Sequence, residues 1–206
     1  MEEVYLQTIE SYNKSAEEYI KNVKGLMPMN EFEKLVKYVK AGRILDVGCG
    51  SGVGCRNLQE RGFEAHGIDL CEKLLEASKI ESPNSLFYKM DMMKLTFPNE
   101  FFDGIWYVAS LLHLKKSDAP IALHEANRVL KKNGVMYLAI KEGEDEGLEE
   151  DKRYGGLLKY YAYYKQKEIE NVLKNENFEI LENYVVEFND SYRIAHPWMN
   201  VFARKL

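Results

Sequence analysis

The sequence has few cysteines and prolines and no long apolar run. Its 206 residues include only 3 Cys and 5 Pro. Cys49, Cys55 and Cys71 are too few, and odd in number, for a disulfide framework, and none has a CxxC or Cys/His spacing that suits a metal. The longest largely apolar stretch, 101–114, is too short to span a bilayer and includes an aspartate and a histidine. We therefore expect no zinc or other metal site, no redox role and no membrane span.

Positive charge is also scarce, with 28 Lys and Arg against 33 Asp and Glu and a net charge of −5. Duplex binding draws its affinity from basic residues set against phosphates, so this balance argues against a nucleic-acid partner. The N-terminal residues MEEVYLQTIE place acids where a signal peptide needs a basic start and an apolar centre. With 46% hydrophobic residues, we expect one globular domain in a soluble, cytoplasmic protein.

From residue 42 onwards, short apolar runs alternate with longer amphipathic segments. This alternation is typical of a parallel sheet with crossover helices. Predicted strands cover 43–47, 63–68, 86–90, 101–108 and 135–141. Predicted helices cover 53–61, 71–80 and 117–130. Lys131, Lys132 and Gly134 predict the basic last turn and the end of the third of these helices.

The composition changes abruptly after residue 141. The acidic stretch 142–151 predicts an exposed loop, and the tyrosine-rich stretch after it leads into a helix over 165–176. Two further strands, 178–188 and 198–203, are joined by a polar turn at 189–191. Two strands joined without a helix between them pair antiparallel or lie apart.

The most informative stretch is Asp46-Val47-Gly48-Cys49-Gly50-Ser51-Gly52, between a predicted buried strand and a helix. Glycines there let the backbone turn sharply and approach a ligand closely. A dinucleotide fingerprint needs a small residue at its third position, and Val53 or Cys55 fits poorly. A phosphate loop needs Gly-Lys-Ser/Thr, which does not occur. The remaining pattern, acid-x-Gly-x-Gly-x-Gly, resembles the first motif of the class I S-adenosylmethionine-dependent methyltransferases.

That resemblance implies that Asp46, Gly48, Cys49 and Gly50 contact S-adenosylmethionine. It also implies an α/β fold, with a Rossmann-like, doubly wound, seven-stranded sheet that is mostly parallel and has an antiparallel terminal strand. The single domain 1–206 then divides into four consecutive parts. These are an N-terminal helical cap, 1–41, with helices over 2–23 and 30–40; a cofactor-binding core, 42–141; a lid insertion, 142–165; and a helix with the terminal strand pair, 166–206.

Two aspartates follow neighbouring predicted strands. Asp69 comes 21 residues after Gly48, where a carboxylate can accept hydrogen bonds from both ribose hydroxyls. An N-cap of the following helix is an equally natural reading of Asp69. The resemblance places an acceptor for the adenine amino group at Asp91, for which a solvated strand end is the alternative. Leu70 and Met92 would then contact the adenine faces.

The stretches FDGIWY at 102–107 and SLLHL at 110–114 resemble the family's fourth motif, with Leu112 in place of the first of two histidines. The resemblance implies that the Tyr107 carbonyl lies near the cofactor's amino group. It also implies that His113 faces the methyl-acceptor pocket.

At the N-terminus, SYNKSAEEY resembles a cap helix of small-molecule members, in which tyrosines corresponding to Tyr12 and Tyr19 close over the cofactor. An amphipathic helix with two core aromatics is the alternative. Near residue 130, LKKNGV resembles the family's LKPGG turn, with Lys and Asn replacing Pro and the first Gly. The matches run in the expected order from residue 12 to residue 134, and on them the chain is identified as a member of the family.

S-adenosylmethionine carries its methyl group on a sulfonium, so a nucleophile displaces it in line. The protein contributes alignment and, where the acceptor must lose a proton, a base. Histidine titrates near neutrality, which makes His113 the predicted catalytic base, with a structural histidine as the alternative. His66 and His124 are read as packing or surface residues, and His196 as a weaker pocket candidate.

The acceptor is expected beyond the carboxyl ends of the strands, beside the tyrosine-rich lid. Arg153 could pair with an acceptor carboxylate or phosphate, and Tyr154, Tyr160 and Tyr164 could supply apolar area and hydroxyl groups. Packing of some of these tyrosines against the domain is the alternative. The predicted function is methyl transfer to an O, N or S of a small metabolite. The alternatives are a tRNA or protein methyltransferase and a non-catalytic S-adenosylmethionine-binding protein, and the sequence leaves the acceptor and the oligomeric state open.

Overall fold

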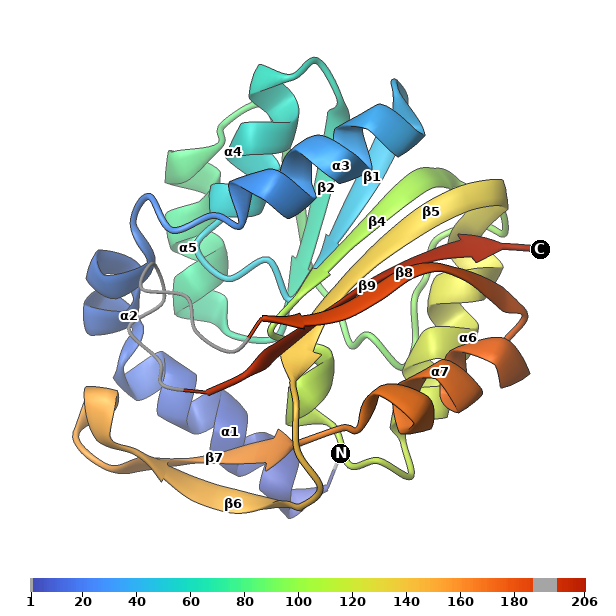
Figure 1. Cartoon of the computed structure of the whole chain (residues 1–206). Coiled ribbons are helices and arrows are strands. Elements are labelled where there is room, and N and C mark those ends of the chain that lie inside the picture. Colours follow the sequence, from blue (N-terminus) through green and yellow to red (C-terminus); the bar gives the residue numbers. More distant parts are fainter. Residues whose placement is uncertain (1, 187–195) are drawn as a thin grey trace.

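A seven-stranded sheet forms the centre of the molecule, which is described by a computed structural model over residues 2–186 and 196–206. The strand order is β3-β2-β1-β4-β5-β9-β8 (Figure 1). Strands β1 to β5 pair in parallel, whereas β9 runs antiparallel to both β5 and β8. This arrangement confirms the predicted fold class. The strands are β1 (Arg43–Val47), β2 (Glu64–Asp69), β3 (Leu86–Lys89), β4 (Phe102–Val108), β5 (Leu130–Lys141), β8 (Phe178–Val186) and β9 (Trp198–Lys205).

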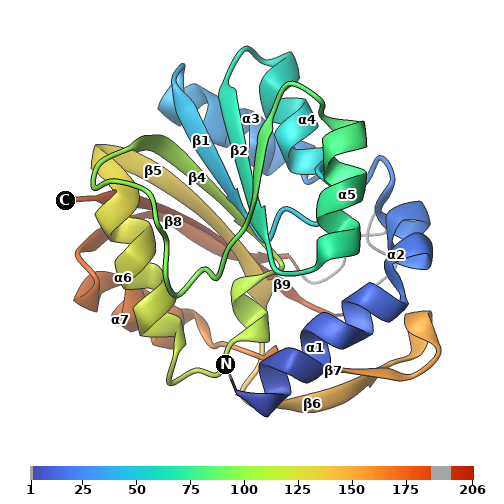
Figure 2. The ribbon, with the colours of Figure 1, turned by 180° about the vertical axis from the view of Figure 1, so that it is seen from behind.

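Helices cover both faces of the sheet, because each strand carries apolar side chains on both sides. The buried side chains of α3, α4 and α5 pack on one face, and those of α6 and α7 on the other (Figures 1 and 2). Across the described ranges, no helix combines the length and apolar character needed to cross a bilayer. The helices are α3 (Met29–Val39), α4 (Val53–Glu60), α5 (Glu72–Glu81), α6 (Ala119–Val129) and α7 (Gln166–Asn175). The predicted turn at 189–191 lies outside the described residues.

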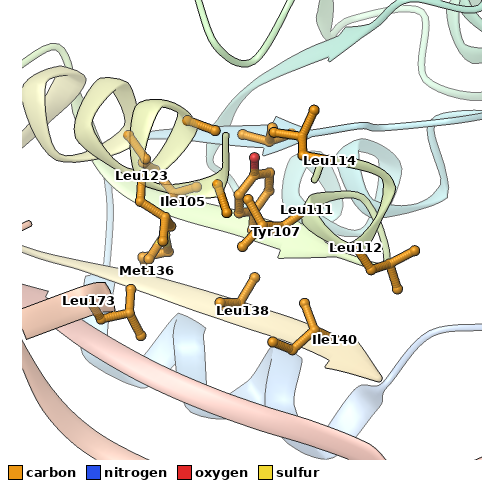
Figure 3. Close-up of a cluster of buried hydrophobic side chains, with 14 of the residues drawn as sticks. Ile105, Tyr107, Leu111, Leu112, Leu114, Leu123, Met136, Leu138, Ile140 and Leu173 are labelled. Carbon is orange, nitrogen blue, oxygen red and sulfur yellow. The ribbon is translucent and has the colours of Figure 1, made fainter. Parts of the chain in front are cut away.

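The larger core cluster fills the space between the sheet and α6 and α7. Figure 3 shows Tyr107 from β4 among aliphatic side chains from β4, β5 and the helices. Leu111 and Leu112 belong to a single 3-10 turn, Leu111–His113, that follows β4. Since both leucines are buried, this turn is held against the core and fixes the backbone next to His113.

The end of α6 differs from the prediction. The helix ends at Val129, before the basic run, and β5 begins at Leu130. Leu130 pairs with Phe102 and Val135 pairs with Gly104, so the residues between them form an irregularity in the strand. The reason is burial: Leu130 is fully buried beside β4, and strand pairing begins there rather than after the glycine.

Two helices stand where the prediction had one helix over residues 2–23. Helix α1 (Glu3–Lys14) ends at Ser15, and α2 (Ala16–Val23) follows directly. The Ser15 hydroxyl donates to the Ser11 carbonyl at 2.8 Å, a local bond that competes with helix continuation. Tyr12 on α1 and Tyr19 on α2 both line the same cavity.

The prediction of an exposed loop over 142–151 is wrong for its second half. Strand β6 (Glu146–Asp151) pairs antiparallel with β7 (Leu157–Ala162) as a separate two-stranded sheet. The acidic side chains of β6 mostly face solvent, and its polarity hid a strand whose stability comes from its tyrosine-rich partner. The hairpin packs against α1, where the Tyr160 amide donates to Thr8 Oγ1 at 2.9 Å (Figure 2).

Candidate active site

A cavity of about 260 Å³ lies at the carboxyl ends of the parallel strands. The strand order reverses between β1 and β4, and ligands of open α/β sheets bind at such a reversal. Helices α1 and α2 and the β6–β7 hairpin contribute the outer wall. Of the predicted cofactor residues, the following line this cavity: Tyr12, Tyr19, Asp46, Gly48, Cys49, Gly50, Asp69, Leu70, Asp91 and Met92.

The loop after β1 is held so tightly that Gly48 has room for no side chain. Its φ is +71°, and a Cβ there would lie 2.3 Å from the Cβ of Ser110. The amides of Gly48 and Cys49 both donate to the Ile68 carbonyl at 2.9 Å. At Gly50 a Cβ would come 3.0 Å from the Tyr19 hydroxyl. The glycines thus leave bare backbone beside the cavity, which suits close approach of a cofactor's amino-acid portion.

Asp69 joins this loop to α5. One carboxylate oxygen accepts from the Gly50 amide at 2.9 Å, and the other accepts from the Cys71 amide at 2.8 Å. Burial raises the pKa of Asp69, and these backbone bonds oppose the rise. Each carboxylate oxygen has a second lone pair, so the bonds to the backbone leave room for ribose hydroxyls. Binding of the ribose by Asp69 stays a prediction.

Replacement of Asp69 by alanine is expected to weaken S-adenosylhomocysteine binding by about 1–3 kcal/mol, since an acceptor for bound hydroxyls is lost. The measurement is calorimetric titration. The melting temperature is recorded as well, because the variant also loses the hydrogen bonds from the Gly50 and Cys71 amides to Asp69. Glu72→Ala, an exposed acid on α5 paired with Lys89, is the matched control and should leave the affinity unchanged. Equal affinities for wild type and Asp69→Ala would remove Asp69 from the binding site.

Asp46 lies buried beneath the glycine loop at the end of β1. Burial raises the pKa of its carboxyl group to about 7, and the charge of Asp69 acts in the same direction. The Cys55 thiol donates to Asp46 at 3.7 Å. A positively charged ligand next to Asp46 would favour the ionised form and lower that pKa. All three cysteines are buried free thiols.

The opposite wall of the cavity is apolar and includes Met90, Met92 and Met93. Asp91 accepts from the Met93 amide at 2.9 Å, so its side chain is oriented by its own turn. The Tyr107 side chain points into the core (Figure 3). Its hydroxyl donates to the Met92 sulfur at 2.7 Å. The expectation for Tyr107 concerned its main-chain carbonyl, and it stays a prediction.

His113 lies at the far end of the cavity in a defined tautomer. Its Nδ1 is 2.7 Å from the Tyr160 carbonyl, which can only accept, so Nδ1 carries the proton. Nε2 is 2.9 Å from the Tyr12 hydroxyl and accepts from it. Burial lowers the pKa of His113 to about 3, with further lowering by the nearby Lys159 and Lys141. His113 is therefore a neutral hydrogen-bond acceptor at pH 7.

The predicted acceptor residues divide into two groups. Arg153 and Tyr154 line the cavity, whereas Tyr160 and Tyr164 do not. Successive side chains of a strand point to opposite faces, so the register of β7 turns Tyr161 toward the cavity and Tyr160 away from it. The Tyr160 hydroxyl instead donates to Glu146 at 2.7 Å, and Tyr164 is 1% exposed within the core.

The remaining histidines lie elsewhere. His66 is buried in an aromatic cluster and stacks on Tyr88, and the exposed His124 contacts Glu176. His196 donates to the Glu142 carbonyl at 2.8 Å and is not among the residues that line the cavity.

Sequence reasoning missed two buried lysines at this end of the cavity. Lys141, the last residue of β5, lines the cavity and is 8% exposed, and Lys159 on β7 is fully buried. Lys159 donates to Asp151 at 3.1 Å, and its ammonium group lies 4.0 Å and 3.9 Å from the ring centres of Tyr12 and Tyr154. The available signal was the lysine that ends the apolar run YLAIK, at the sheet edge where ligands bind.

The order of the strands, the glycine loop and the cavity at the strand reversal are those of a Rossmann-like methyltransferase domain. Residues 45–138 of the chain match the family model described as "Methyltransferase domain". S-adenosylmethionine is the cofactor of this family.

Among curated proteins, the chain is similar to a putative methyltransferase, YqeM, of Bacillus subtilis, with 35% identity over 121 residues. That match covers 54% of this chain and 49% of the relative, so the chain spans about half of the relative's length.

Two solved structures share the fold. A methyltransferase of Methanosarcina mazei aligns with a TM-score of 0.75 and 22% identity, over 88% of this chain and 98% of that one. The 1,6-didemethyltoxoflavin-N1-methyltransferase of Burkholderia thailandensis, solved with bound 1,6-didemethyltoxoflavin and S-adenosylhomocysteine, aligns with a TM-score of 0.77 and 16% identity, over 97% of this chain and 88% of that one.

Proposed function

We propose that this protein transfers the methyl group of S-adenosylmethionine to a small-molecule acceptor. The observation that carries the proposal is a single cavity that joins the glycine loop and Asp69 at one end to His113 and Tyr161 at the other. When bound, S-adenosylmethionine supplies an activated methyl group on a sulfonium. The Burkholderia enzyme, which has this fold and a small heterocyclic acceptor in its name, supports a small acceptor.

At the cofactor end, the chain's own residues bind and orient. Gly48 and Gly50 present backbone, Asp69 offers carboxylate lone pairs, and the methionines supply apolar contact. Tyr12 and Tyr19 contribute to the outer wall, with their rings edge to face at 5.4 Å. Such a wall excludes water and holds the reacting groups in line, which is the main contribution a protein can make to this displacement.

At the acceptor end, Tyr12 and His113 can accept a proton in sequence. The hydroxyl of Tyr12 already donates to His113 Nε2, so its oxygen keeps lone pairs for an O–H or N–H of the acceptor. As the acceptor loses its proton, Tyr12 takes it and passes its own to Nε2. The low pKa of His113 makes it a weak base, and we expect orientation of the acceptor to be the larger part of its role.

A tRNA or protein acceptor is the second candidate and requires a nucleotide or side chain to enter the cavity from outside. Such an acceptor would have to pass the outer wall of the cavity, in which Thr8 of α1 is hydrogen-bonded to the β6–β7 hairpin through the Tyr160 amide. A non-catalytic binding protein is the third candidate. It would keep the cofactor end without needing the Tyr12–His113 pair, and the pair therefore favours turnover.

Titration calorimetry with S-adenosylmethionine and with NAD, followed by transfer of a tritiated methyl group to a metabolite panel and to bulk tRNA, tests the proposal. We expect the protein to bind S-adenosylmethionine but not NAD, and to transfer the tritiated methyl group to a small molecule. Failure to bind it at millimolar concentration would overturn the proposal. Label in tRNA would favour the second candidate, and binding without transfer to any acceptor would favour the third.

Replacement of His113 by alanine is expected to lower the rate of methyl transfer about 100-fold, the lower end for a group that handles a proton. S-adenosylhomocysteine affinity should stay within about twofold of wild type, since the glycine loop is untouched. Tyr12→Phe should slow transfer too, and the double variant should be no slower than His113→Ala, because the two groups act as one unit. An unchanged rate in His113→Ala would exclude both roles for this residue.

A further inference from the structure

Lys141 is a buried cation at the cavity, and none of the described acidic side chains is bound to it. Its ammonium group lies 3.8 Å from the ring centre of Tyr161 and 5.3 Å from that of Tyr163. Within residues 2–186 and 196–206, the Lys141 ammonium group makes no hydrogen bond and no ion pair. Burying an ammonium group by more than nine-tenths without a charged partner costs desolvation free energy. Because Lys141 faces the cavity, an anionic group of a bound ligand could be that partner.

The charged side chains around Lys141 have other partners among the described residues. Asp151 accepts from Arg153 Nε at 2.9 Å and Nη2 at 2.8 Å, and from Lys159 at 3.1 Å. Glu149 is exposed and accepts from the Tyr163 hydroxyl at 2.7 Å. The buried Lys141, Lys159 and Asp151, together with the more exposed Arg153, thus form a group of three cations and one carboxylate. This end of the cavity favours an anion.

Lys141 belongs to the acceptor end. The glycine loop follows β1, and β4 separates β1 from β5, on which Lys141 lies. The Tyr161 ring that lies against the Lys141 ammonium is 5.1 Å from the His113 ring, centre to centre. A group bound by Lys141 would therefore lie beside the Tyr12–His113 pair, on the far side of β4 from the loop that receives the cofactor.

We propose that Lys141 binds a carboxylate of the methyl acceptor, and that the acceptor is a planar carboxylic acid that packs against Tyr161. This inference rests on the proposed function and narrows its substrate class. One uncommitted cation matches a group with one negative charge, and the ring of Tyr161 supplies a flat face for a planar acceptor. Arg153, which the sequence suggested for this role, already donates two hydrogen bonds from its guanidinium group to Asp151.

The proposal is tested by calorimetry at saturating S-adenosylhomocysteine with hydroxybenzoates and aminobenzoates, each paired with its neutral primary amide. In wild type, we expect at least one acid to bind about tenfold or more tightly than its amide, as a charge-assisted hydrogen bond is lost in the amide. Lys141→Met should remove this preference. Lys34→Met, a lysine paired with Glu182 away from the cavity, should keep it. A phosphate monoester arm, phenyl phosphate, asks whether a dianion binds better.

The outcomes separate the proposal from its alternatives. No preference for any acid, a preference that survives in Lys141→Met, or a stronger preference for phenyl phosphate would each overturn it. If Lys141→Met weakens S-adenosylhomocysteine itself about tenfold, Lys141 serves the cofactor carboxylate, and the proposal fails while the proposed function stands. Loss of S-adenosylhomocysteine binding in wild type would instead sink the proposed function.

Stability and pH give independent readouts. Because Lys141 has no partner among the described residues, Lys141→Met should melt at the wild-type temperature or higher, whereas a structural lysine would lower it. Burial lowers the pKa of Lys141 to about 8, so acid binding should be constant at pH 6–7 and weaken as the pH rises through 8. The charged groups around Lys141 are Glu149, Asp151, Arg153 and Lys159, and burial lowers the pKa of Lys159 to about 8 as well. Comparison with Lys141→Met assigns the change.

Discussion

Asparagine in place of Asp151 is expected to lower the free energy of unfolding by about 3–5 kcal/mol at pH 7, because a buried cation loses its partner. That cation is Lys159, whose side chain is 0% accessible to solvent and forms its ion pair with Asp151. Asp151 also accepts from the Arg153 side chain and, at 3.2 Å, from the Tyr161 hydroxyl. Urea denaturation of wild type and variant at pH 7 measures the difference.

The matched control is Glu150→Gln, an exposed neighbour on β6, which should change the stability by less than about 0.5 kcal/mol. A double variant, Asp151→Asn with Lys159→Met, should regain much of the lost stability because no buried charge is left unpaired. If Asp151→Asn and Glu150→Gln are equally stable, the Asp151 ion pairs do not stabilise the hairpin.

The pH dependence follows from the direction of each shift. Burial raises the pKa of Asp151, but the Arg153 hydrogen bonds and the Lys159 charge outweigh it and hold the pKa below 3.8. Its stabilising contribution is therefore present above pH 4 and is lost as acid protonates the group. In Asp151→Asn, Lys159 can relieve the cost by losing its proton, because the carboxylate that raised its pKa is gone, so the destabilisation should shrink as the pH rises from 7 to about 8, the pKa of Lys159 in the wild type.

Alanine in place of Gly48 is expected to raise the dissociation constant of S-adenosylhomocysteine at least about 100-fold and to lower the free energy of unfolding by about 2–5 kcal/mol. Two effects add: a positive φ costs an alanine about 1–2 kcal/mol, and overpacking costs about 1–3 kcal/mol. The new Cβ would lie 2.3 Å from Ser110, so the loop must shift, and a shift of about 1 Å misplaces a bound ligand by enough to account for the loss.

Gly62→Ala separates the cost of the positive φ from the cost of overpacking. Gly62 has a similar φ of +83° but nothing within 4 Å of its Cβ position. That variant should lose about 1–2 kcal/mol of stability from the backbone strain alone and bind S-adenosylhomocysteine as wild type does. Calorimetric titration and urea denaturation of both variants decide the matter. Normal binding by Gly48→Ala would show that the loop does not form the cofactor site.

Much of the cofactor end could be predicted because its information is local. Gly48 follows a buried strand directly, and Asp69 and Asp91 end or follow neighbouring strands of a parallel sheet, which meet at one edge. Apolar runs and amphipathic segments located the strands and helices of the core to within a few residues. The exception, the start of β5, depended on pairing with β4.

The acceptor end could be predicted only in outline. The acidic composition of 142–151 hid β6, because a strand stabilised by its partner needs little apolar character of its own. Without the register of β7, the sequence could not tell which tyrosines face the cavity, and it named Tyr160 and Tyr164 in place of Tyr161. One step of register reverses every side chain of a strand.

The methyltransferase motifs, the order of the core elements and the glycine loop can be read from the sequence, because each depends on residues that are adjacent along the chain. Which distant groups meet depends on how the whole chain packs. Tyr12 and His113 are 101 residues apart and share a hydrogen bond, and β5 and the hairpin bring Lys141 to Tyr161. The physical reason is that burial and pairing of charges are properties of the packed chain. In the unfolded chain water solvates every lysine alike, and only folding takes some of them out of water.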